Sequence, residues 1–133
     1  MDNIVNGIDL VQCERIERMV ERHGERFLER VFTETERSYA SRNKNKIECL
    51  AGRFAAKEAV LKVMGTGWRG KISWQDIEVI NDAAGKPLVH LTGELRKISE
   101  RLGIYDVSVS VTHTGNFAIA SAVAVRRDGS ERI

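Results

Sequence analysis

Hydrophobic residues alternate with polar ones, or recur every three to four positions, along most of the chain, and these two periods predict its elements. The runs that are typical of strands cover residues 4–11, 77–80, 88–91, 107–112 and 118–125. Helices are expected over residues 13–32, 47–64 and 93–102, with a short one that begins after Thr33 and fades in the polar run 41–46. Helices mixed with mainly local strand hairpins predict an α+β fold, in which a small, mainly antiparallel sheet packs against the long helix 47–64.

The composition is that of one globular domain, expected over residues 1–133. Hydrophobic residues make up 42% and charged residues 30% of the chain, and the net charge is only +2. This charge argues against a nucleic-acid-binding protein. The first residues do not resemble a signal peptide, and no apolar run approaches membrane-spanning length. With Cys13 and Cys49 read as free thiols, we expect a cytoplasmic protein without nucleic-acid or membrane partners.

Glu58 is a carboxylate at a position where the helical period predicts core. It falls between Phe54 and Leu61 on one stripe of the helix 47–64. An ion pair with Lys62, one turn further on, is the commoner role of such a residue, but an exposed pair of this kind contributes only about 0.3–0.5 kcal/mol, whereas burying an ion costs several. A bound metal ion is the alternative.

Asp9 is a second acid in an apolar setting, near the end of the first strand. Two carboxylates completed by water and phosphate oxygens make a typical magnesium site. Alone, Asp9 is equally explained as a helix cap or the mark of a strand end. The residues alone leave both interpretations of Asp9 open, as a metal ligand and as a cap or strand end.

Two further segments combine a structural explanation with a functional one. Gly65-Thr66-Gly67 is explained as the end of the long helix, yet its amides and hydroxyl, with Lys62 nearby, also suit a phosphate. His113 follows an alternating strand, at a position from which a side chain reaches the sheet edge.

The first helix separates its charges by sign. Arg15, Arg18, Arg22 and Arg26 lie on one stripe, and glutamates occupy the next. Ion pairs on a solvated helix explain this pattern, and so does a basic strip that recognises an acidic helix of a partner.

Taken together, these segments resemble the holo-[acyl-carrier-protein] synthase family of 4′-phosphopantetheinyl transferases. The resemblance covers nearly the whole chain, in the family's order and spacing, and rests on Gly7-Ile8-Asp9, Phe54-Ala55-Ala56-Lys57-Glu58-Ala59 with Lys62, Gly65-Thr66-Gly67, Asp76-Ile77-Glu78-Val79, Gly85-Lys86-Pro87 and Ser110-Val111-Thr112-His113-Thr114. Trp68 departs from the family, in which a smaller apolar residue is common there, and Phe117 stands where many relatives have tyrosine.

The resemblance implies an enzyme that transfers 4′-phosphopantetheine from coenzyme A to a serine of apo acyl carrier protein, releasing adenosine 3′,5′-bisphosphate, in support of fatty acid biosynthesis. It implies that Asp9 and Glu58 bind Mg²⁺, and that these acids and Lys62 form the catalytic group. The serine is deprotonated either by a metal-bound water or by Glu58. The chief rival, a non-catalytic coenzyme A-binding module, would be favoured by loss of these three residues, which are all present.

The resemblance also implies the binding surfaces. Coenzyme A is expected to contact Arg53, Lys62, Gly65, Thr66, Gly85, Lys86, Pro87, His113 and Thr114. The acidic recognition helix of the carrier is expected to meet Arg15, Arg22 and Arg26. Family members are compact homotrimers with active sites between subunits, so we expect the same assembly here.

Overall fold

The three longest strands form an antiparallel sheet in the order β1-β5-β4. A computed structural model describes residues 1–129, and the last four residues of the expected domain, 130–133, lie outside the described part. The strands are β1 (Asn3–Gln12), β4 (Ile104–Thr114) and β5 (Phe117–Arg126). They extend the predicted segments by one to three residues at each end. The pairing places Asp9 opposite Ala120 and His113 opposite Ala118, so both candidate residues belong to the same sheet.

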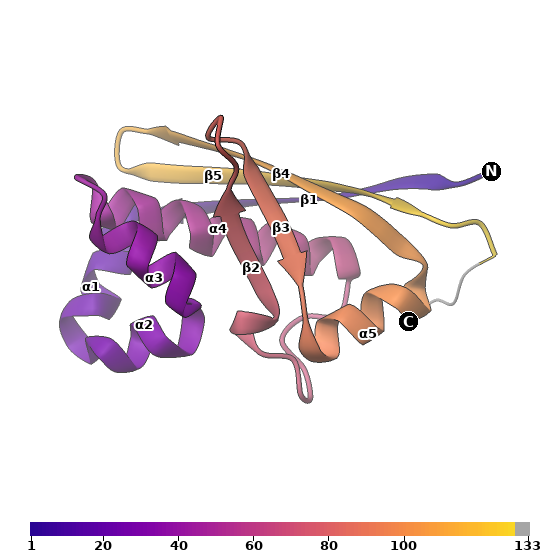
Figure 1. Ribbon diagram of the computed structural model, residues 1–133, viewed down its shortest axis with the longest axis horizontal. Coiled ribbons are helices and arrows are strands. Elements are labelled where there is room, and N and C mark those ends of the chain that lie inside the picture. The colour runs from indigo at the N-terminus through magenta and orange to yellow at the C-terminus, as the bar shows by residue number, and fades with distance from the viewer. Residues whose placement is uncertain (130–133) are drawn as a thin grey trace.

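The long helix α4 (Lys46–Met64) runs along one face of this sheet (Figure 1). Four alanines of β5, at every second position from Ala118 to Ala124, are buried on that face. Their small side chains allow the helix to lie close to the sheet. Thirty buried hydrophobic residues, contributed by helices and strands alike, form one core around α4, which agrees with the predicted compact α+β domain.

The predicted helix 13–32 is in fact two helices, α1 (Cys13–His23) and α2 (Glu25–Val31). Gly24 separates them with φ 51°, a left-handed conformation that glycine adopts readily. His23, the last residue of α1, is exposed. The short helix α3 (Glu34–Ser41) begins with the predicted capping box between Thr33 and Glu36.

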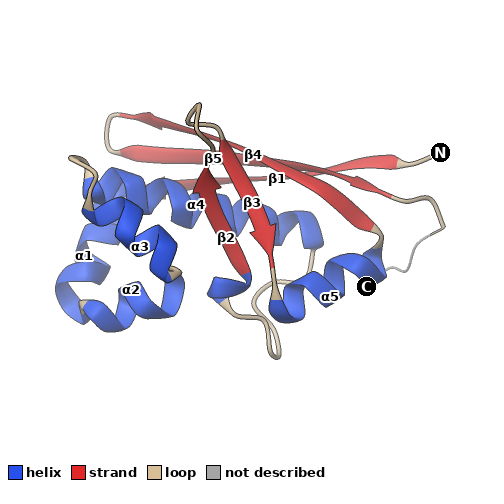
Figure 2. Cartoon of the chain, viewed as in Figure 1, coloured by secondary structure: helices blue, strands red, loops and turns tan. Residues whose placement is uncertain are grey.

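A second, two-stranded sheet is the predicted hairpin of β2 (Ile77–Asn81) and β3 (Pro87–Leu91). The short 3₁₀ helix η1 (Trp74–Asp76) precedes it and α5 (Gly93–Leu102) follows. Figure 2 shows helices α1, α2 and α3 gathered at one end of α4 and α5 near the other end. Among residues 1–129, no helix combines the length and the apolar character needed to span a membrane.

Helix α4 is buried on most of its surface, not on one stripe as predicted. Even Lys57 is fully buried, and its Nζ lies 2.7 Å from Oε1 of Glu36 on α3. The same ammonium donates hydrogen bonds to the carbonyls of Trp74 (3.1 Å) and Ile77 (2.5 Å). Glu36 in turn accepts from the amide of Val79 at 2.8 Å. This pair therefore joins α3, α4 and the start of the hairpin.

Candidate active site

The end of β1 meets the last turns of α4 at an unusually close approach. A Cβ atom added to Gly7 would overlap the carbonyl oxygen of Ala59 and lie 2.9 Å from Cβ of Lys62. Glycine is therefore required here by the packing of strand on helix. Because side chains of a strand alternate between faces, Asp9 points to the same face as Gly7. The Gly-Ile-Asp motif thus brings an acid to α4.

Lys62 completes this contact. Its Nζ donates to the carbonyl oxygen of Ile8 at 2.8 Å and lies 3.3 Å from Oδ1 of Asp9. The side chain of Asp9 is 18% exposed and that of Lys62 55% exposed, so the pair remains open to solvent on one side. An exposed ion pair of this geometry adds little stability, which leaves the ammonium available to phosphate groups.

Glu58 is half-buried on α4, on the side of the helix near Asp9. Burial raises the pKa of the Glu58 carboxyl group, and the negative charge of Asp9 raises it further. The indole Nε1 of Trp68 lies 3.5 Å from Oε1 of Glu58, and this hydrogen bond opposes the increase in pKa. Among the ion pairs of residues 1–129, none joins Glu58 to Lys62, so the ordinary intrahelical pair is not formed.

The donor atoms around Glu58 and Asp9 suit a hard cation. Ionising both carboxylates is costly because they are close and one is half-buried, and a divalent cation would offset this cost. No group of three or more histidine, cysteine or acidic residues is present within 1–129 to form a complete protein cage. Mg²⁺ commonly takes only one or two carboxylates and completes its shell with water and phosphate oxygens. The residues therefore fit a magnesium ion that is shared with a phosphate ligand.

A second group of predicted residues lines one pocket between α4, the hairpin turn and β4. Its walls include Arg53, Gly85, Pro87 and His113. The guanidinium of Arg53 donates to Oδ1 of Asn81 and stacks over the ring of Tyr39, 4.5 Å from its centroid. Among buried side-chain nitrogen and oxygen atoms of the described chain, Nε of Arg53 lacks a hydrogen-bond partner.

The ring of His113 packs directly on α4, at a glycine within that helix. Its Nε2 lies 2.8 Å from the carbonyl oxygen of Glu48. A Cβ added to Gly52 would lie 3.0 Å from the same ring nitrogen. The glycine, which weakens a helix by about 1 kcal/mol relative to alanine, thus makes room for the histidine.

Four other residues that were predicted to bind coenzyme A do not line this pocket: Gly65, Thr66, Lys86 and Thr114. Gly65 caps α4 with φ 74°, as its structural interpretation predicts. Thr66 is buried and lines another hollow with Arg69, Lys71 and Glu94. Lys86 and Thr114 are exposed, and neither is among the residues that line the Arg53 pocket.

A groove on the helical end of the molecule contains two of the three predicted carrier contacts, Arg15 and Arg26. Its apolar walls are Met19, Phe27, Val31, Phe54 and Trp74. Arg22 is exposed on α1 and is not among the lining residues. A mixed apolar and basic groove is the kind of surface that binds an amphipathic acidic helix.

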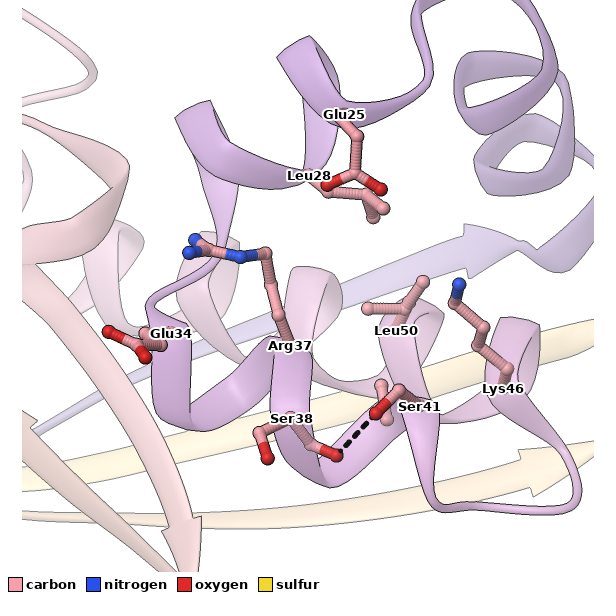
Figure 3. A pocket seen from close by; sticks show the side chains of 9 residues that line it. Glu25, Leu28, Glu34, Arg37, Ser38, Ser41, Lys46 and Leu50 are labelled. Atoms are coloured by element: carbon pink, nitrogen blue, oxygen red, sulfur yellow. Dashed lines mark hydrogen bonds between the residues drawn. The ribbon is translucent and has the colours of Figure 1, made fainter.

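A further hollow between α2, α3 and the start of α4 contains none of the predicted site residues (Figure 3). Its rim carries charges of both signs, and the hydrogen bond from Ser41 to the Ser38 carbonyl stays within α3. The junction of β1 and α4, where Asp9, Glu58 and Lys62 lie together, is thus the candidate active site.

Three contributors to the site were missed by sequence analysis. They are the indole of Trp68 beside Glu58, the ring of Trp74 in the groove, and Gly52 behind His113. A glycine within a helical run was a usable signal of close packing. The two tryptophans gave no such signal, because only the fold brings them together.

Comparison with known proteins identifies relatives of this chain. The model of a family described as the 4′-phosphopantetheinyl transferase superfamily matches residues 6–122. A holo-[acyl-carrier-protein] synthase from Solibacter usitatus is 44% identical over 117 residues, which cover 88% of this chain and 94% of that protein.

Solved structures give the same result. The crystal structure of the synthase from Neisseria meningitidis matches with a TM-score of 0.83 at 37% identity, over 90% of this chain and 96% of that one. The Helicobacter pylori enzyme, solved in complex with coenzyme A, matches with a TM-score of 0.79 at 34% identity, over 90% and 98%. The family expected from the sequence is confirmed.

Proposed function

The chain belongs to the 4′-phosphopantetheinyl transferase superfamily, and from this premise we propose that it is a holo-[acyl-carrier-protein] synthase. It moves 4′-phosphopantetheine from coenzyme A to a serine of apo acyl carrier protein. The observation that carries this proposal is the meeting of Asp9, Glu58 and Lys62 where β1 packs on α4. These residues combine two acids and a cation at one solvent-accessible point, as transfer between phosphates requires.

The reaction exchanges the phosphoanhydride bond of coenzyme A for a phosphate ester bond to serine. The serine oxygen bonds to the β-phosphorus of coenzyme A, and the bond from that phosphorus to the bridging oxygen breaks. Adenosine 3′,5′-bisphosphate leaves with the electron pair, and the serine proton passes to a base. The Lys62 ammonium, next to Asp9, supplies positive charge for the phosphates.

Asp9 and Glu58 hold Mg²⁺ in this proposal. When bound, the ion neutralises charge on the pyrophosphate. The acids keep their charged form because the ion offsets the burial that raises the pKa of Glu58. Glu58 is also a candidate for the base that accepts the serine proton.

Coenzyme A is assigned to the Arg53 pocket and the Thr66 hollow. The guanidinium of Arg53 and the ring of His113, which both line the pocket, suit its nucleotide phosphates. Lys86 and Thr114 lie near the ends of the pocket's own elements, with Lys86 between its lining residues Gly85 and Pro87. The two hollows share no lining residue, which is consistent with a coenzyme that contacts two subunits.

The assembly is a homotrimer in this proposal. The face of the sheet that points away from α4 carries four exposed apolar residues, Ile4, Ile8, Leu10 and Val123. The exposed fraction of Ile8, for example, is 62%. Exposed apolar residues that cluster in this way are typical of a protein interface.

The carrier occupies the groove lined by Arg15 and Arg26, and Arg22 is exposed on the same helix as Arg15. Two buried, unpaired cysteines suit the reducing cytoplasm, where carrier modification would serve fatty acid biosynthesis.

To test the function, the protein is incubated with coenzyme A, Mg²⁺ and apo acyl carrier protein, and released adenosine 3′,5′-bisphosphate is measured by chromatography. Release should require the apo carrier, and the holo carrier serves as control. Release that is equal with both carriers, or no release at all, would contradict the proposal.

A further inference from the structure

Three aromatic rings form a continuous stack between the groove and Glu58. Trp68 lies in the loop after α4, and its ring stacks on that of Trp74 with centroids 4.0 Å apart and planes 30° apart. Trp74 stacks in turn on Phe54 of α4, with centroids 4.9 Å apart. The three rings therefore come from a loop, from the 3₁₀ helix η1 and from the central helix α4.

The two ends of the stack lie at different functional surfaces. At one end, Phe54 and Trp74 line the groove, and the guanidinium of Arg15 lies 5.3 Å from the Phe54 centroid. At the other end, Nε1 of Trp68 donates to Oε1 of Glu58. The indole N–H is a donor without acceptor capacity, so it can fix a carboxylate oxygen but cannot exchange a proton with it at neutral pH.

Resting on the function proposed above, we propose that Trp68 is a positioning residue for Glu58. Its N–H holds Oε1 of the carboxylate and leaves Oε2 to the metal ion, while the stack on Trp74 and Phe54 fixes the indole. Trp68 acts through Glu58 and does not itself touch the reacting phosphates. The alternative is that Trp68 only packs the loop against α4.

Trp68→Phe tests these roles, because phenylalanine removes the N–H donor and keeps one aromatic ring in the stack, although a smaller one than the indole. The readout is the affinity for Mn²⁺ in the presence of coenzyme A, measured by electron paramagnetic resonance of the free ion. Glu58→Gln is the reference variant. We expect W68F to weaken Mn²⁺ binding about fivefold to tenfold, as for the loss of one hydrogen bond of ordinary strength. The transfer rate constant kcat should fall similarly, with the KM values within about twofold.

The outcomes distinguish this inference from the proposed function. If E58Q weakens Mn²⁺ binding but W68F does not, Trp68 is a packing residue and the inference is wrong. If E58Q also leaves the affinity unchanged, the proposed metal role is wrong and the inference falls with it.

A second measurement does not depend on W68F folding. The chain has two tryptophans, so Trp74→Phe leaves Trp68 as the sole indole emitter. Paramagnetic Mn²⁺ bound by Glu58 would then quench this emission in a saturable way, at the concentration at which it binds. Absence of saturable quenching while Mn²⁺ binds would overturn the inference.

Discussion

Nζ of Lys62 lies 3.3 Å from Oδ1 of Asp9, and this contact joins the last turn of α4 to the end of β1. It exists because Gly7 allows the strand to lie directly on the helix backbone. The three residues taken as catalytic thus depend on one packing contact. Stability and activity should therefore respond together to changes at Gly7.

Gly7→Ala should destabilise the protein by about 3 kcal/mol, because the new methyl group meets a backbone carbonyl that cannot move aside. Urea unfolding measures the loss, and transfer activity should fall with it. Gly52→Ala is the matched control: its methyl group meets side chains and no backbone atom, namely the His113 ring and Cγ1 of Val111, each at 3.0 Å. G52A should therefore lose less stability while weakening coenzyme A binding. Equal losses of stability would contradict this explanation.

Lys57→Met should cost about 3–5 kcal/mol of unfolding free energy, because it leaves the Glu36 carboxylate buried without its partner ion. The double variant with Glu36→Gln should cost less than the sum of the single variants. Arg96→Met breaks the exposed pair with Glu100 and serves as control, with an expected loss below about 0.5 kcal/mol. Strict additivity of the Lys57 and Glu36 changes in urea unfolding would show that the pair is not coupled.

The sequence predicted the bounds of an element correctly where the hydrophobic residues keep one spacing along its whole length. Helix 93–102 has the predicted bounds, and the hairpin strands begin and end within one residue of those expected. The break at Gly24 was missed because the apolar spacing from Ile16 to Phe27 and Val31 continues across it. A local change of direction leaves little trace in such a pattern.

The site was predictable only in part for a related reason. Asp9 and Glu58 were identifiable because a carboxylate in an apolar run requires compensation. Lys57, one residue earlier, was named only as part of the family motif, and nothing in the sequence marked it as buried. Its burial depends on Glu36, which lies on another helix, and only the tertiary structure supplies that partner.

Arg15→Glu should raise the KM for the carrier about tenfold and leave the KM for coenzyme A within about twofold. The side chain lines the groove, and reversal of its charge repels an acidic helix. Arg22→Glu should have a smaller effect, because Arg22 is not among the lining residues. Lys97→Glu, on the exposed surface of α5, controls for net charge. A KM for coenzyme A that rises as much as that for the carrier would count against a dedicated carrier groove.

Ile8→Glu should dissociate the proposed trimer, because it places a charge in the apolar sheet face. Sedimentation velocity measures the change in mass. Leu88→Glu replaces an equally apolar but separate exposed residue on β3 and should leave the assembly intact. A wild-type protein that sediments as a monomer would refute the trimer.

The most direct test of the central claim is the intact mass of an apo acyl carrier protein after incubation with this protein, coenzyme A and Mg²⁺. We predict a carrier that is heavier by one phosphopantetheine group, and no change when the acceptor serine is replaced by alanine. Glu58→Gln and Asp9→Asn should abolish or greatly slow the modification. An unchanged carrier mass with the wild-type protein, across several apo carriers, would contradict the account.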